Sequence, residues 1–142
     1  MRVKLQFPEP AVFQTQIPVR ISDINYGAHV GNDSVLSILH EARMQYLQSM
    51  GYTEMNVGGC SLIMADSAIQ YKGESFYGDV LQVEVKAINL SAVSFDLFYR
   101  VQTQRNGEWC LIVLAKTGMI CFDYTLRKIC EIPEVLRKSL SK

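Results

Sequence analysis

Apolar and polar residues alternate with a period of two through most of the second half of the chain, as expected for half-buried β-strands. Two such stretches cover residues 81–87 and 93–101. A third, residues 109–122, is apolar at nearly every position and follows Asn106-Gly107, a dipeptide typical of a tight hairpin turn. The pattern therefore predicts long antiparallel strands.

The first half of the chain has two further patterns. Residues 13–21 alternate and predict a first strand, in which Pro18 suits an edge position or an interruption. After a polar loop, residues 33–50 carry apolar side chains at helical spacing and predict one long helix. Asn32 or Asp33 is suited to cap its first turn.

This order of elements predicts an α+β hotdog fold, in which a long central helix is wrapped by a curved antiparallel sheet of about five strands. One helix covers one face of a sheet, yet residues 109–122 are apolar on both sides. We therefore expect the other face to meet a neighbouring subunit in a homodimer or homotetramer. Pro133 indicates a short terminal helix over residues 134–140. Residues 1–142 contain no linker or repeat, so we expect a single domain.

Charge and composition narrow the possible partners. The chain has 14 Lys and Arg against 14 Asp and Glu, so no net field favours nucleic acid or a membrane surface. The N-terminus lacks the apolar stretch of a signal peptide, and no run is long enough for a membrane helix. The four cysteines form no CxxC pair, which argues against a zinc site. We therefore expect a cytoplasmic protein without a metal.

The polar loop carries a motif, Val19-Arg20-Ile21-Ser22-Asp23-Ile24-Asn25-Tyr26-Gly27-Ala28-His29-Val30-Gly31-Asn32. It resembles the signature of the 4-hydroxybenzoyl-CoA thioesterase-like hotdog family, approximately Arg-Tyr-x-Asp-x-Asp-x-x-Gly-His-Val-x-Asn. Residues 40–47, His-Glu-Ala-Arg-Met-Gln-Tyr-Leu, resemble the end of that family's helix. Tyr71 before Gly78-Asp79, and residues 121–137, resemble its later landmarks.

The resemblance implies an acyl-CoA or acyl-carrier thioesterase that cleaves a thioester to a free acid and a thiol. Coenzyme A would enter as part of the substrate, and no other cofactor is implied. Two alternatives stay open. A protein of this fold can bind an acyl-CoA or acyl carrier without hydrolysing it, or it can act as a dehydratase or hydratase.

One position departs from the family. Where many members have a catalytic Asp, this chain has Asn25, which cannot accept a proton at neutral pH. The candidates for activating water are then Asp23, His29 and Glu41. Asp23 is near enough in sequence to orient the His29 imidazole. Backbone N–H groups at the helix start, around Gly31 and Asn32, are expected to stabilise an oxyanion.

Each candidate also has a structural interpretation. His29 could hold the loop through the backbone, Glu41 could form an ion pair with Arg43, Arg20 or a lysine elsewhere, and Asn32 could cap the helix. His40 and Asp66 are candidates for binding substrate, as are Gly31 and Asn32. A satisfied histidine and a solvated carboxylate are the simpler accounts of His40 and Asp66. The nucleotide of coenzyme A would meet surface cations such as Lys72, Arg100 or Arg127.

Overall fold

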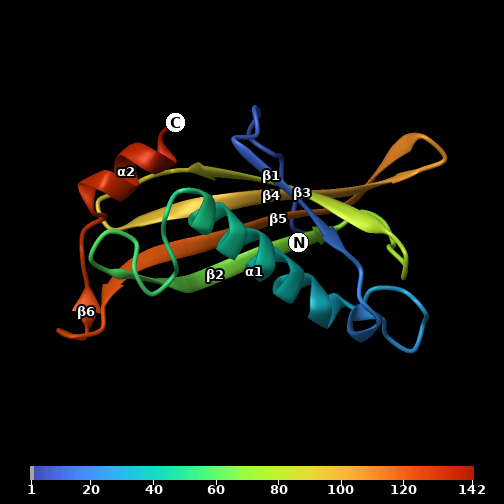
Figure 1. Ribbon diagram of the computed structural model, residues 1–142, viewed down its shortest axis with the longest axis horizontal. Helices are drawn as coiled ribbons and strands as arrows, with labels where there is room; N and C mark the ends of the chain where they lie inside the picture. Colours follow the sequence, from blue (N-terminus) through green and yellow to red (C-terminus); the bar gives the residue numbers. More distant parts are fainter. Residues whose placement is uncertain (1) are drawn as a thin grey trace.

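The computed structural model describes residues 2–142 (Figure 1). One long helix lies across a curved antiparallel sheet, and a short helix lies at one end. The elements in chain order are β1 (Phe13–Pro18), the 3₁₀-helix η1 (Ile21–Asp23), α1 (Asn32–Ser49), β2 (Ser61–Tyr71), β3 (Val80–Ile88), β4 (Ser94–Arg105), β5 (Glu108–Asp123), β6 (Lys128–Ile129) and α2 (Glu134–Leu140).

The strand order is β1-β3-β4-β5-β2, with β6 paired to β5, and every pairing is antiparallel. The predicted hairpin turn joins β4 to β5, and both of its residues have positive φ, 53° at Asn106 and 79° at Gly107. The prediction of a long helix on a curved antiparallel sheet is confirmed. The sheet has six strands among the described residues rather than about five, because the two-residue β6 carries no readable pattern.

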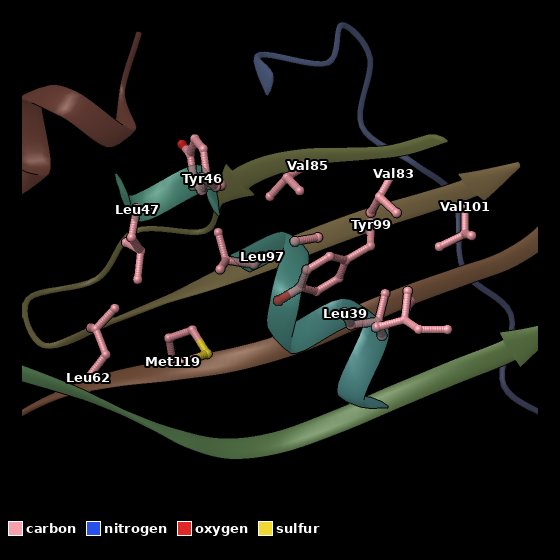
Figure 2. Close-up of a cluster of buried hydrophobic side chains, with 14 of the residues drawn as sticks. Leu39, Tyr46, Leu47, Leu62, Val83, Val85, Leu97, Tyr99, Val101 and Met119 are labelled. Atoms are coloured by element: carbon pink, nitrogen blue, oxygen red, sulfur yellow. The ribbon is translucent and has the colours of Figure 1, made fainter. Parts of the chain in front are cut away.

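The core lies between α1 and the concave face of the sheet (Figure 2). Leu39, Tyr46 and Leu47 project from the helix toward side chains of the strands, namely Leu62, Val83, Val85, Leu97, Tyr99, Val101 and Met119. On β3 the inward-facing residues alternate with polar ones, so the two-residue period of the strand faces the helical repeat of α1. Burial of this one shared face holds the helix in place.

Two local predictions are wrong at the start of the loop and the helix. The first strand ends at Pro18, and Ile21 lies in η1 with its side chain 72% exposed. The carboxylate of Asp23 accepts a hydrogen bond from the backbone N–H of Arg20 at 2.8 Å, which turns the chain out of the strand direction. Neither Asn32 nor Asp33 caps α1. Its N-cap is Gly31, and no side chain makes a capping hydrogen bond.

The face of the sheet away from α1 is partly covered by the chain's own N-terminal segment. Phe7 is buried there, and the guanidinium of Arg100 lies 4.6 Å from its ring centroid. The backbone N–H of Leu5 donates to Gln70 Oε1 on β2 at 3.1 Å. The N-terminal segment therefore occupies part of the face that we expected a neighbouring subunit to cover. Within residues 2–142, no helix is long and apolar enough to cross a membrane.

Candidate active site

The loop between β1 and α1 is held by a buried carboxylate. Asp23 is 3% exposed, and its two oxygens accept hydrogen bonds from Arg20 Nε at 3.4 Å and Nη2 at 3.2 Å. The hydrogen bond and the charge of Asp23 raise the pKa of Arg20. The carbonyl of Asp23 also accepts the N–H of Gly31 at 3.0 Å. Asp23 therefore fixes the loop through Arg20 and Gly31, and the structure does not give it the expected contact with His29.

Asn25 and His29 close a tight turn at the tip of this loop. Asn25 Oδ1 accepts the N–H of Gly27 at 2.9 Å, and the N–H of Asn25 donates to the carbonyl of His29 at 2.9 Å. His29 Nδ1 lies 3.2 Å from the carbonyl oxygen of Val30. A carbonyl only accepts, so in the neutral ring Nδ1 carries the proton and Nε2 presents a lone pair. The backbone contact therefore favours the tautomer in which Nε2 is free to accept a hydrogen bond.

A cavity of about 200 Å³ lies beside this histidine. We call it the His29 cavity, and its lining is His29, Val30, Asn32, Val35, Tyr71, Gly73, Glu74, Ser75, Ile112 and Val113. The residues come from the loop, the first turn of α1, the end of β2 with the segment after it, and β5. The N–H of Val30 donates to the carbonyl of Ser75 at 2.8 Å, which joins these segments. The cavity thus combines a histidine side chain, a helix start without a side-chain cap and an apolar wall.

Glu41 and His40 line a different cavity of about 420 Å³, between α1 and β1. We call it the Glu41 cavity, and its lining is Gln16, Ile17, Pro18, Arg20, Ser37, Ile38, His40, Glu41, Met44 and Gln45. Glu41 forms no ion pair with Arg43, and its Oε2 accepts from Gln45 Nε2 at 2.8 Å. The two cavities share no lining residue. The structure therefore divides the candidate site residues between two places.

His40 leads into a chain of polar contacts that reaches the core. Its Nε2 lies 2.5 Å from Glu54 Oε1, and Glu54 Oε2 accepts from Arg43 Nε at 3.1 Å. Arg43 Nη1 donates to the hydroxyl of Tyr99 at 3.2 Å, and this hydroxyl is hydrogen-bonded to Thr117 Oγ1 at 2.7 Å. Burial lowers the pKa of Arg43, and its contacts with Tyr99 and Glu54 outweigh that effect, so the net direction is upward.

Sequence reasoning did not single out Glu54, Tyr99 or Thr117. Glu54 lies in the loop after α1, 14 residues from His40 and 11 from Arg43, so no helical or strand periodicity links it to them. The one available signal was Arg43 itself, a charged residue on the apolar side of a helix that requires a buried partner.

Asp66 lies at an irregularity in the β2–β5 pairing and does not line either cavity. One of its oxygens accepts from Lys116 Nζ at 2.9 Å and from the N–H of Gly118 at 3.0 Å. The hydrogen bond from Lys116 is the main cause that lowers the pKa of Asp66. These contacts account for Asp66 as a structural residue on the exposed part of β2.

The three cations considered for coenzyme A lie far apart. Lys72 follows Tyr71 and precedes Gly73, two residues of the His29 cavity. Arg100 is held by Glu84 at 2.7 Å and by Glu9 on the face away from α1. Arg127 is in the turn between β5 and β6, at the other end of the molecule from the start of α1 (Figure 1). Lys72 is the one of the three beside a candidate site.

Among residues 2–142, no group of three His, Cys, Asp or Glu side chains is arranged to hold a metal ion.

A single helix cradled in a curved antiparallel sheet, with a histidine-bearing loop at its N-terminal end, defines a hotdog-fold protein. The family model described as the thioesterase-like superfamily matches residues 19–140, which is most of the chain. The chain belongs to this superfamily. The match includes the loop, the helix and all strands after them.

Individual relatives agree with this assignment. A 1,4-dihydroxy-2-naphthoyl-CoA hydrolase from Synechococcus elongatus is 25% identical over 131 residues, which is 89% of this chain and 93% of the relative. A 1,4-dihydroxy-2-naphthoyl-CoA thioesterase structure from Synechocystis is similar with a TM-score of 0.81 at 22% identity, covering 92% of this chain and 96% of that one. A mutant 4-hydroxybenzoyl-CoA thioesterase in complex with 4-hydroxybenzoyl-CoA has a TM-score of 0.81 at 17% identity, covering 90% and 97%. The two structures establish the fold.

Proposed function

We propose that the protein is an acyl-CoA thioesterase and that its chemistry takes place in the His29 cavity. The observation that carries this proposal is the orientation of His29, whose Nδ1 contact with the Val30 carbonyl leaves Nε2 as the proton acceptor. The relatives named as hydrolases of CoA thioesters support the same reaction class. A base is needed here because Asn25 does not supply a carboxylate.

In the proposed reaction, His29 Nε2 takes a proton from water while the water oxygen bonds to the thioester carbonyl carbon. The free N–H groups in the first turn of α1 stabilise the resulting oxyanion. The bond between carbon and sulfur then breaks, and the imidazolium returns its proton to the leaving thiolate. The products are a free acid and a thiol. Lys72, next to the cavity, is the cation best located to meet the phosphates of coenzyme A.

The decisive experiment compares His29→Gln with Glu41→Gln in a thiol-release assay over acetyl-, benzoyl-, 4-hydroxybenzoyl- and palmitoyl-CoA. Loss of a general base lowers kcat by about 10²–10⁴-fold, and we expect this for His29→Gln. Glu41→Gln leaves the His29 cavity unchanged, so its kcat should stay near that of the wild type. The reverse result would move the chemistry to the Glu41 cavity.

A second candidate function is acyl-CoA binding without hydrolysis, favoured by Asn25, which is engaged in the turn and offers no base. Calorimetric binding of an acyl-CoA without thiol release would establish this alternative.

The variant Asn25→Asp keeps an oxygen for the N–H of Gly27. A strong gain of hydrolysis in this variant would mean that the natural chain is specialised for another task. Hydration of an enoyl-CoA tests for a hydratase.

We also propose a homodimer formed through β2. This strand is 11 residues long and lies at the edge of the sheet, and four consecutive residues from Met64 to Ser67 are exposed. An unpaired edge of this length favours pairing with another copy. Light scattering should therefore give twice the 16.1 kDa mass of the chain, and a monomer would refute the proposal. A tetramer would need a further surface, such as the part of the outer sheet face that the N-terminal segment leaves free.

A cytoplasmic location is proposed on the basis of the cysteines. Cys60, Cys110, Cys121 and Cys130 are all free thiols. Free thiols persist in reducing compartments. Fractionation of the native host cell, with detection of the chain by antibody, tests this location.

A further inference from the structure

A small void lies beside the His29 cavity. The void has about 10 Å³ of accessible space, close to the room that one water molecule needs. Five residues line both spaces, namely Val30, Val35, Ser75, Ile112 and Val113. The void therefore adjoins the His29 cavity on the side of the hydrophobic core.

Four apolar side chains form the far wall of the void, Ile38 and Leu39 from α1, Leu81 from β3 and Val101 from β4. Leu81 and Val101 are at most 2% exposed. They lie on neighbouring central strands, where Leu81 pairs with Thr103 and Val101 pairs with Val83. Hydrogen-bonded strands on both sides hold their backbones, so this part of the wall cannot retreat from a bulky ligand.

The volumes set a limit on what the pocket accepts. A cavity of about 150 Å³ accepts a benzene molecule. The 200 Å³ of the His29 cavity therefore accommodates one aromatic ring with its carbonyl, or a short acyl chain. A second fused ring directed toward the core would have to occupy the void, whose 10 Å³ is far too small.

We infer that Leu81 and Val101 determine substrate specificity, because they form the floor of the acyl pocket and limit the acyl group to one ring or a short chain. This inference rests on the proposed function and goes beyond it by naming the size class of the acyl group. It also separates this chain from its relatives named for a two-ring naphthoyl substrate. The floor acts by exclusion, since a larger acyl group cannot bring its carbonyl to His29.

The test uses Val101→Ala and a matched control, Val85→Ala. Val85 is 0% exposed and faces α1 from β3, but it lines neither the cavity nor the void (Figure 2). Both substitutions remove the same atoms from the same core layer. Values of kcat/KM are measured for benzoyl-CoA and 2-naphthoyl-CoA with wild type and both variants, after circular dichroism has established that each is folded.

In the wild type, benzoyl-CoA should be the better substrate. We expect Val101→Ala to raise the naphthoyl-to-benzoyl ratio of kcat/KM by at least about tenfold, within the range by which pocket volume changes alter specificity. Val85→Ala should leave the ratio unchanged. If Val101→Ala does not fold, the milder Leu81→Val is compared with Leu97→Val, a buried position outside the pocket, and the same direction is expected.

The outcomes separate the two proposals. Hydrolysis of neither thioester by the wild type, or of any other acyl-CoA, contradicts the proposed function. A second result is that the wild type hydrolyses benzoyl-CoA while Val101→Ala and Leu81→Val leave the naphthoyl-to-benzoyl ratio of kcat/KM unchanged. That result refutes the role of Leu81 and Val101 in specificity and is consistent with the proposed function. The role of Leu81 and Val101 is also refuted if the wild type prefers the naphthoyl thioester, or if Val85→Ala raises the ratio of kcat/KM as much as Val101→Ala does.

Discussion

Replacing Glu54 by glutamine tests the polar chain beneath α1. The variant keeps an oxygen that can accept from Arg43 Nε, so it loses the charge rather than the contact. Removing one partner of a fully buried ion pair costs about 3–5 kcal/mol. The side chain of Arg43 is 7% exposed and that of Glu54 is 19% exposed, so water compensates part of the loss. We expect the free energy of unfolding to fall by about 2 kcal/mol.

Urea denaturation followed by far-UV circular dichroism measures this change, and the melting temperature should fall by about 6–10 °C. The control is Glu108→Gln, at an exposed carboxylate at the start of β5, which should change the free energy of unfolding by less than about 0.5 kcal/mol. His40→Ala is a second comparison. His40 is 55% exposed, so loss of its contact with Glu54 should cost less than about 1 kcal/mol.

The stability of a double variant, compared with that of Glu54→Gln alone, shows whether the unpaired charge or lost packing causes the destabilisation. In Arg43→Met with Glu54→Gln no unpaired charge is left, and the Tyr99 hydroxyl keeps its bond to Thr117. The double variant should therefore be more stable than Glu54→Gln alone. The reasoning is refuted if the double variant is the less stable of the two, or if Glu54→Gln costs no more than the Glu108 control.

Three further predictions concern other parts of the core and sheet. A Cβ at Gly118 would lie 2.3 Å from Asp66 Oδ1, so Gly118→Ala should cost about 1–2 kcal/mol in thermal melts, and adding Asp66→Ala should restore most of it. Burial raises the pKa of Tyr46 to about 12, whereas the unfolded side chain ionises near 10. The neutral Tyr46 side chain therefore makes its full contribution to the free energy of unfolding below pH 10. About 3 kcal/mol is then lost as pH rises to 12, and denaturation at pH 9–12 should show a smaller loss for Tyr46→Phe. Burial and the neighbouring Cys121 raise the pKa of Cys60, so mass spectrometry should find Cys60 alkylated at pH 8 only after urea unfolds the protein.

Local patterns determined the main elements. The helical repeat predicted α1 to within one residue at each end, and Asn106-Gly107 predicted the β4–β5 turn. Pro18 was expected at an edge or an interruption, and it ends β1 at the edge of the sheet. These features depend on neighbours in sequence, through the 3.6-residue period, the turn geometry and the missing N–H of proline.

The candidate site was predicted less completely. The sequence named His29 and its loop, and it left open whether the imidazole contacts the backbone or a carboxylate. The structure gives the Nδ1 contact to Val30 and engages Asp23 with Arg20 instead. It also separates His29 from Glu41, both candidates for activating water, because the two residues line different cavities.

What the sequence alone determined is the class of fold and the course of the loop in which we propose the chemistry, because periodicity and turn chemistry act over a few residues. The tertiary structure decided which side chains meet. Glu54 contacts Arg43 and His40, Ser75 borders the pocket beside His29, and Val101 closes that pocket, each through contacts between segments far apart in the chain. Such contacts arise when the sheet curves around the helix, and no short-range pattern encodes them.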